Sequence, residues 1–283
     1  MKLEQRSDNR NMAPLPSSGS QSVARALSVL DLLSEASEEL GVREMARRLN
    51  LAPSIVQRLV GTLANCGYIE RLAGAQKYGI GYRAFHVGHS YLSHSDLHEV
   101  SLPELRALAE QYEVNTFLGV LRDRAIVYLA AIQSSGPIVI RNSPGSKTWL
   151  HSTALGKALL AEMKDDEVAD ILGSQPYHRL TPKTKTTHGR LTADLRQIRR
   201  QGYAVSDEEN LEGVFSVGAV IRDSTGNAIA ALSCALPRNR LRRSDRENLY
   251  RAVTEATQRI SRRLGATAPS HPSPNTKTRA RKL

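Results

Sequence analysis

The chain has 283 residues, a formal net charge of +11 and 40% hydrophobic residues. This length accommodates two domains, and no apolar run reaches the roughly 18 to 20 residues that a membrane span requires. The positive charge favours polyanionic partners, nucleic acid first, and the amino terminus lacks the apolar core of a signal peptide. We therefore expect a cytoplasmic protein with no membrane partner.

Neither cysteine belongs to a metal-binding pattern. Cys66 and Cys234 lie far apart, outside any CxxC pair, and small or apolar residues flank both. We expect reduced core thiols, no structural metal and no other cofactor. Ser, Pro and Asn dominate residues 1–20, and Pro, Ser, Lys and Arg dominate residues 266–283, so both ends are predicted to be disordered tails.

Three amphipathic helices are predicted near the amino terminus. The first starts after Ser22, a suitable N-cap, and residues 42–63 indicate two more helices joined by a tight turn. Asn50 at the bend tolerates left-handed backbone, and Pro53 suits the first turn of the last helix because its missing N–H is no loss there. The predicted inward positions are Val23, Leu27, Leu30 and Leu33, then Met45, Ala46 and Leu49, then Val56, Leu59, Val60 and Leu63.

A polar face marks the last of these helices. Ser54, Gln57 and Arg58 point away from its buried stripe, which places a hydroxyl, an amide and a guanidinium near the start of an exposed helix. Such a helix can read the major groove of DNA. An ordinary helical hairpin with a solvated polar face accounts equally well for this stretch taken alone.

The segment after these helices, residues 67–81, favours a DNA-binding domain over a plain helical hairpin. Residues 67–81 alternate like two short strands around the turn Ala73-Gly74-Ala75, which predicts a β-hairpin. Three helices followed by a hairpin make a winged helix-turn-helix. Arg71 and Lys77 lie on the wing, where they could meet the DNA backbone.

Residues 82–94 are expected to form a helix that links two domains. His86, His89 and His94 fall within it, but their spacing places them only partly on one face and no carboxylate joins them. Linker and dimer-contact histidines are therefore favoured over a metal site.

From Asp96 to Gly265 predicted strands and helices alternate. The helical segments are 97–112, 153–163, 166–173, 191–203 and 244–264, and the strand segments are 116–121, 125–132, 138–143, 213–223 and 228–236. Hairpin turns are expected at 122–124 and 224–227. Several hairpins with intervening helices indicate an α+β domain built on one antiparallel sheet.

Two segments resemble a known family. Residues 150–161 (LHSTALGKALLA) and 202–223 (GYAVSDEENLEGVFSVGAVIRD) resemble hallmark segments of IclR-type bacterial transcriptional regulators, and the resemblance covers residues 21–265. It implies a winged helix-turn-helix over 21–81, a linker helix over 82–95 and a GAF-like effector domain over 96–265. It also implies a homodimer or dimer of dimers that binds double-stranded operator DNA of a catabolic operon and responds to a small organic or aromatic acid.

The resemblance makes Pro53–Asn65 the recognition helix. Ser54 would bond a phosphate, and Gln57 and Arg58 would reach base edges or nearby phosphates. Pro53 stands where relatives often have Lys, and Ile55 stands where they often have Thr. The operator sequence therefore does not follow from the resemblance.

The resemblance also implies an effector pocket, bounded by Ile140, Ala154, Leu155, Ser206, Ser216, Ser233 and Ala235. Three of these depart from the family pattern, since Ser206 replaces a common Asp, Ser216 a common Cys and Ala235 a common Ser. The site becomes less polar, so we expect a somewhat larger, partly apolar ligand such as an aromatic acid, held by small hydroxyls and backbone N–H groups.

Two other classes of protein compete with a ligand-responsive repressor or activator. For an enzyme, Gly156-Lys157 lacks the rest of a phosphate loop, and His151, Ser152 and Lys157 lack a nucleophile elbow. The acidic run 207–209 fits a solvated turn better than a metal site. A DNA-binding architectural protein without an effector suits the basic tail but not the large second domain, so a regulator without enzymatic activity is the favoured interpretation.

Overall fold

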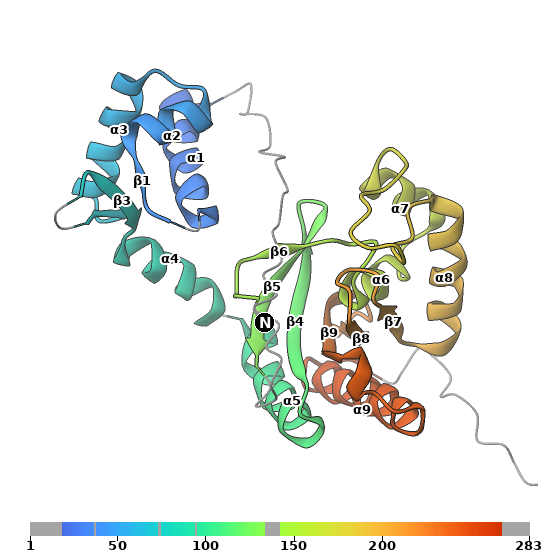
Figure 1. Cartoon of the computed structure of the whole chain (residues 1–283). Coiled ribbons are helices and arrows are strands. Elements are labelled where there is room, and N and C mark those ends of the chain that lie inside the picture. Colours follow the sequence, from blue (N-terminus) through green and yellow to red (C-terminus); the bar gives the residue numbers. More distant parts are fainter. Residues whose placement is uncertain (1–18, 37, 73–74, 94, 134–141, 268–283) are drawn as a thin grey trace, which may run out of the picture. The chain divides into compact units, whose positions relative to one another are not determined.

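The chain forms two compact units that divide between Ser95 and Asp96 (Figure 1). The computed structural model describes residues 19–36, 38–72, 75–93, 95–133 and 142–267. The predicted tails 1–20 and 266–283 therefore lie almost entirely outside the described residues, as do Ala73, Gly74 and His94. No helix in the described part of the chain is both long and apolar enough to cross a membrane.

Helices and a small sheet make up the first unit (Figure 1). Its elements run α1 (Gln21–Glu35), β1 (Leu40–Gly41), α2 (Val42–Leu49), α3 (Pro53–Asn65), β2 (Ile69–Arg71), β3 (Lys77–Ile80) and α4 (Tyr82–Ser93). The strands pair antiparallel in the order β1-β3-β2. The predicted hairpin is β2 with β3, and β1 is an addition that sequence reasoning missed because two residues show no alternation.

The turn between α2 and α3 has the predicted backbone. Asn50 caps α2 with φ 53° and ψ 46°, and Pro53 is the first residue of α3. Core residues shared by the helices and the sheet are Val29, Leu33, Leu40, Met45, Ala46, Val56, Val60 and Ile69, with Leu49, Leu59 and Leu63 packed against them. The predicted inward faces of α2 and α3 are therefore confirmed.

The prediction for α1 is wrong in two respects. Ser20, not Ser22, caps the helix, because its side chain accepts a hydrogen bond from the Val23 N–H. Val23 and Leu27 are 58% and 55% exposed, whereas the helix buries Val29 and Leu33. At 3.6 residues per turn Val23 and Leu27 fall on the side away from Val29, so α1 carries two apolar stripes and only one packs inward.

The second unit is built on one antiparallel sheet, as predicted (Figure 1). Its elements run α5 (Asp96–Tyr112), β4 (Asn115–Arg122), β5 (Ala125–Ile132), β6 (Lys147–Thr148), α6 (Ala154–Leu160), α7 (Asp165–Leu172), α8 (His188–Gln201), β7 (Ala204–Asp207), β8 (Val214–Arg222), β9 (Ala228–Pro237), the 3₁₀ turn η1 (Arg238–Arg240) and α9 (Arg243–Arg263). The strand order is β6-β5-β4-β9-β8-β7.

Helices cover both faces of this sheet. Helix α6 packs on one face with α8 behind it, while α5 and α9 pack on the other and on each other. Alternation along β9 matches this layering, because Ala231 and Ala235 join the core on the α6 side while Leu232 and Cys234 face away from it. The α6 side is the one that holds the predicted effector residues.

Three details of the second unit and one of the first differ from expectation. Strands β6 and β7 were missed because both are short, and most of the strand predicted at 138–143 lies outside the described residues. The described remainder, Asn142 and Ser143, is not in a strand. Cys234 is a buried thiol as predicted, but Cys66 is exposed at the end of α3.

Candidate DNA-binding surface and effector cavity

The exposed face of α3 carries the residues predicted to contact DNA. Ser54, Gln57 and Arg58 are all exposed, whereas Val56 and Val60 on the other side of the helix are fully buried. Within the described residues, none of these three polar side chains makes a hydrogen bond or an ion pair. Their donors and acceptors are therefore available to a ligand.

Two arginines of helix α2, unlike Arg58 on α3, are paired with a carboxylate of their own helix. Arg47 donates to the Glu44 carboxylate at 2.9 and 2.6 Å, and Arg48 donates to it at 2.6 Å. These hydrogen bonds, from Arg47 first and Arg48 second, lower the pKa of Glu44 to about 2. The two guanidiniums are partly neutralised within their own helix, while α3 keeps an unpaired guanidinium at Arg58.

The wing presents two further cations. Arg71 ends β2 and Lys77 begins β3, and both side chains are exposed. The Leu72 N–H donates to the Lys77 carbonyl at 3.1 Å, which holds the two strands together beside the turn. A pair of exposed cations on a hairpin suits phosphate contacts, which position a protein on DNA without reading its sequence.

Six of the seven residues predicted for the effector pocket line one cavity on the α6 side of the sheet. They are Ala154, Leu155, Ser206, Ser216, Ser233 and Ala235. The seventh, Ile140, lies outside the described residues. Further lining residues, which sequence reasoning did not name, are Phe117, Tyr128, Asn142, Thr153, Asn210, Leu211 and Val214.

Strand register explains why these distant residues meet. Ser206 of β7 pairs with Ser216 of β8, and Ser216 pairs with Ala235 of β9, so the three form a row across the sheet. Ser233 lies two residues before Ala235 on the same face of β9. Helix α6 closes the other side with Ala154 and Leu155.

Hydrogen bonds hold the polar groups around the cavity in place. The Ser206 hydroxyl donates to the Ser152 carbonyl at 2.7 Å, and the Ser152 hydroxyl donates to Asn210 Oδ1 at 2.9 Å. Asn142 Nδ2 donates to the Tyr128 hydroxyl at 3.3 Å. Burial raises the pKa of Tyr128 to about 12, so its phenol stays neutral and able to donate a hydrogen bond.

The cavity itself is small. Its volume is about 40 Å³, room for a few water molecules, whereas ligand sites usually reach about 300 Å³ or more. Asn210 and Leu211, in the segment between β7 and β8, form part of its wall. A ligand of that size therefore fits only if part of the cavity wall moves outward.

A buried ion cluster anchors that wall. Lys157 of α6 is fully buried and donates to Glu209 at 2.6 Å and to Asp194 at 2.7 Å, while Lys185 lies 2.7 and 2.9 Å from the same two carboxylates. Burial opposes ionisation of Asp194, but Lys157 and Lys185 outweigh it and lower the pKa of that carboxyl. The Thr184 hydroxyl also donates to the Glu209 carbonyl at 2.7 Å. Glu209, next to Asn210, is thus held from several sides.

The same contacts account for the acidic run. Asp207 pairs with Arg238 at 2.6 Å, Glu208 with Lys183, and Glu209 with Lys157. The solvated turn predicted for these three acids is wrong for Glu209, which is buried because it belongs to the ion cluster, and for Asp207, which ends strand β7. Each carboxylate has a cation as its partner, an arrangement that stabilises a fold rather than one that awaits a metal ion.

The residues of the imagined enzyme sites have structural roles. A Cβ at Gly156 would lie 2.2 Å from the Leu150 carbonyl oxygen, so glycine is needed there for close packing. His151 Nε2 bonds the His178 carbonyl oxygen at 2.9 Å, and Ser152 bonds Asn210, so these two side chains do not form a nucleophile–base pair.

Comparison with known proteins places both units in one family. Residues 22–73 match the IclR helix-turn-helix domain, and residues 89–262 match the bacterial transcriptional regulator IclR C-terminal domain. The chain is 34% identical over 245 residues to the HTH-type transcriptional regulator BhcR of Paracoccus denitrificans (strain Pd 1222), covering 87% of this chain and 88% of that protein.

Solved structures agree on the fold. A putative transcriptional regulator from Rhodococcus sp. RHA1 superposes with a TM-score of 0.77 at 28% identity, over 87% of this chain and 98% of that one. An IclR homolog from Microbacterium hydrocarbonoxydans, solved in complex with 4-hydroxybenzoate, has a TM-score of 0.75 at 23% identity, over 86% and 98% of the two chains. The family is one of transcriptional regulators rather than of enzymes. The chain belongs to the IclR family of bacterial transcriptional regulators.

Proposed function

We propose that this chain regulates a catabolic operon in the cytoplasm by binding operator DNA and responding to an organic acid. The proposal that the chain binds operator DNA rests on the polar face of α3, where Ser54, Gln57 and Arg58 are exposed and unpaired within the described residues. Arg58 and Gln57 reach base edges and supply specificity, while Ser54 and the wing residues Arg71 and Lys77 bond phosphates and supply affinity.

The first test is Arg58→Ala. We expect operator affinity to fall about 5- to 150-fold, the equivalent of about 1 to 3 kcal/mol, with base preference relaxed at the contacted position. Fluorescence anisotropy with DNA taken from upstream of the chain's own and neighbouring genes measures both effects. Arg106→Ala, an exposed arginine of α5, controls for the loss of one charge. Operator affinity unchanged by Arg58→Ala would refute the assignment.

The effector half of the proposal places a partly apolar organic acid in the cavity beside α6. Ser216 and Ser233 supply hydroxyl donors for its carboxylate, while Ser206 lines the cavity with its own hydroxyl donated to the Ser152 carbonyl. Phe117, Leu155 and Val214 supply apolar walls. A ligand changes DNA binding only through a difference in affinity between the DNA-competent and incompetent states. Because the wall at Asn210 and Leu211 must move to admit an acid, that segment is the element whose position differs between the two states.

A thermal-shift screen tests the ligand class. Benzoate, 4-hydroxybenzoate and pyruvate form a first set, and an aromatic acid at about 100 times its Kd should raise the melting midpoint by about 5 °C or more. Ser216→Leu should abolish this shift while leaving operator affinity intact. Stabilisation by pyruvate alone would overturn the aromatic assignment, and a flat response to a wide acid panel would favour an effector-independent architectural protein.

The oligomer is proposed from exposed apolar surface. Among the described residues, helix α4 has no buried side chain, and its Tyr82, Phe85 and Tyr91 are 69%, 62% and 55% exposed. Exposed apolar groups on this scale mark an interface, and a second copy of the chain would cover them and supply the second recognition helix of a two-fold operator. His86 and His89 on the same helix would then be dimer-contact residues. Sedimentation at monomer mass at micromolar concentration would contradict this proposal.

A further inference from the structure

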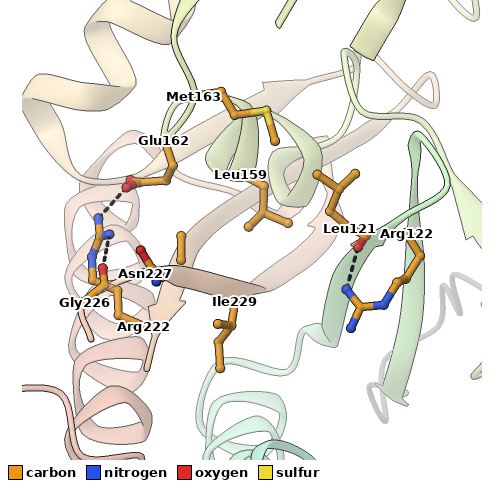
Figure 2. Close-up of a pocket in the computed structure, with 10 residues that line it drawn as sticks. Leu121, Arg122, Leu159, Glu162, Met163, Arg222, Gly226, Asn227 and Ile229 are labelled. Carbon is orange, nitrogen blue, oxygen red and sulfur yellow. Dashed lines mark hydrogen bonds and ion pairs between the residues drawn. The ribbon is translucent and has the colours of Figure 1, made fainter. Parts of the chain in front are cut away.

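A second and larger cavity lies in the second unit, at the end of the sheet where β4 and β9 separate (Figure 2). The two strands pair from Asn115↔Ala235 to Gly119↔Ala231 and no further, although each continues to pair with its other neighbour. The two hairpin tips thus leave a groove of about 590 Å³ between them. This volume falls within the range of small-molecule sites.

Apolar side chains form the walls of this groove. Figure 2 shows Leu159 and Met163 on one side and Leu121 and Ile229 on the two strands that separate. Leu159 belongs to the last turn of α6, and Met163 lies three residues after the end of that helix. An apolar body that entered the groove would therefore contact helix and sheet together.

Two guanidiniums border the groove and are in different electrostatic states. Arg222 pairs with Glu162 at 2.8 Å and also donates to the Gly226 carbonyl at 3.1 Å, so its charge is neutralised (Figure 2). Arg122 is exposed and donates at 2.8 Å to the carbonyl of Leu121, in the part of β4 that no longer pairs with β9. No described carboxylate pairs with Arg122. The groove thus combines an apolar interior with one uncompensated positive charge.

We propose that this groove is a second ligand site, specific for an amphipathic monocarboxylate. Arg122 binds the carboxylate, because a guanidinium presents two parallel N–H groups that match its two oxygens. The apolar body lies against Leu121, Leu159 and Ile229, where it is withdrawn from water. Only one charge is uncompensated, so the site selects a monoacid with an aliphatic or aromatic body over a dicarboxylate.

The groove and the effector cavity are two ends of one layer between α6 and the sheet. Leu155 lines the cavity and Leu159, one turn later on α6, lines the groove. Phe117 and Leu121 stand in the same relation on β4, four residues apart on one face of the strand. Between the two sites, a Cβ at Gly119 would lie only 3.1 Å from Leu155 Cδ1, so helix and sheet are in tight contact there. This part of the inference rests on the proposed function. A ligand bound in the groove and a ligand bound in the effector cavity contact the same helix α6, so each changes the affinity of the other site for its ligand.

Calorimetric titration of the full chain with octanoate tests the site. Arg122→Gln should weaken octanoate binding about tenfold or more, since it removes the charged partner of the carboxylate. Arg122→Lys keeps the charge but not the two parallel N–H groups, so it should fall between Arg122→Gln and the parent. Octan-1-ol, which has no charge, should bind parent and Arg122→Gln equally. Ile229→Glu should abolish octanoate binding, because it places a like charge in the groove. Arg106→Gln on α5 is the matched control and should change nothing.

The outcome separates this site from the effector cavity. Octanoate binding that survives Ser216→Leu but fails in Arg122→Gln supports the groove. Binding lost in Ser216→Leu and kept in Arg122→Gln places octanoate in the cavity and overturns the inference, as does absence of octanoate binding to the parent protein. Operator affinity, measured on the same samples without octanoate, reports on the proposed function independently.

Discussion

The two units of the chain use polar side chains in opposite ways. On α3 of the first unit Ser54, Gln57 and Arg58 are exposed and, within the described residues, unpaired, above a hydrophobic core. Around the effector cavity of the second unit Ser206, Asn210 and Tyr128 take part in hydrogen bonds within the chain, and beside it a fully buried Lys157 lies among carboxylates. Substitutions of these three residues on α3 should therefore change DNA binding without changing stability, whereas substitutions around the effector cavity should change both ligand binding and stability.

The largest effect on stability is expected in the second unit, when the buried charge of Lys157 is removed. Lys157→Met keeps the volume of the side chain but leaves Glu209 and Asp194 with Lys185 alone, so we expect a loss of about 3 to 5 kcal/mol in the free energy of unfolding. Trp149, the single tryptophan of the chain, lies in the second unit, and its fluorescence during urea unfolding measures that unit alone. Lys183→Met, at an exposed pair with Glu208, should change little. Equal effects of the two variants would show that burial does not matter here.

A smaller effect is expected where α6 approaches the backbone before it. Gly156→Ala forces a Cβ against Leu150 backbone atoms at 2.2 to 2.6 Å, which side-chain rotation does not relieve, and should cost about 1 to 3 kcal/mol. Gly189→Ala is the matched control, since the first turn of α8 has no atom within 4 Å of the new methyl group. That variant should be neutral or slightly stabilising because alanine favours a helix. Trp149 fluorescence again measures both.

The smallest effect is expected in the first unit, for the exposed ion pairs of Glu44 on α2. The pKa of Glu44 is lowered from 4.5 to about 2, so its ion pairs stabilise the fold above about pH 4.5 and lose that contribution as the pH falls towards 2. Glu44→Gln should therefore lower the melting midpoint slightly at pH 6, and the difference from the parent should close with acidification. Circular dichroism melting at several pH values measures this. A difference that widens below pH 4.5 would contradict the assigned pairs.

Local pattern predicted most of the first unit. Helical spacing, the left-handed preference of Asn50 and the position of Pro53 were sufficient to place α2, α3 and their turn. The same pattern was insufficient for α1, because its two apolar stripes are equally apolar in sequence and only contact with α3 and β3 decides which one is buried. Periodicity identifies a face of a helix but does not say what covers it.

The effector site was predictable only in part. The small side chains at Ser206, Ser216 and Ala235 came from the family resemblance, and strand register brings them into one row. Tyr128 and Asn210 were missed, although Tyr128 alternates on a predicted strand and Asn210 lies within a hallmark segment. Lys157 gave no local signal at all, because its partners Asp194 and Glu209 are 37 and 52 residues away. A buried charge network depends on tertiary contacts that a single sequence does not display.

The exposure of Cys66 makes the recognition helix accessible to a reporter. Cys66 follows the last residue of α3 and is exposed, while Cys234 is fully buried and burial raises the pKa of its thiol. A maleimide dye reacts with thiolates, so it should attach at Cys66 and leave Cys234 unmodified in the folded protein. The native sequence thus carries one labelling position beside the proposed DNA-binding surface. Energy transfer from that dye to labelled operator ends would follow docking in real time without a single substitution.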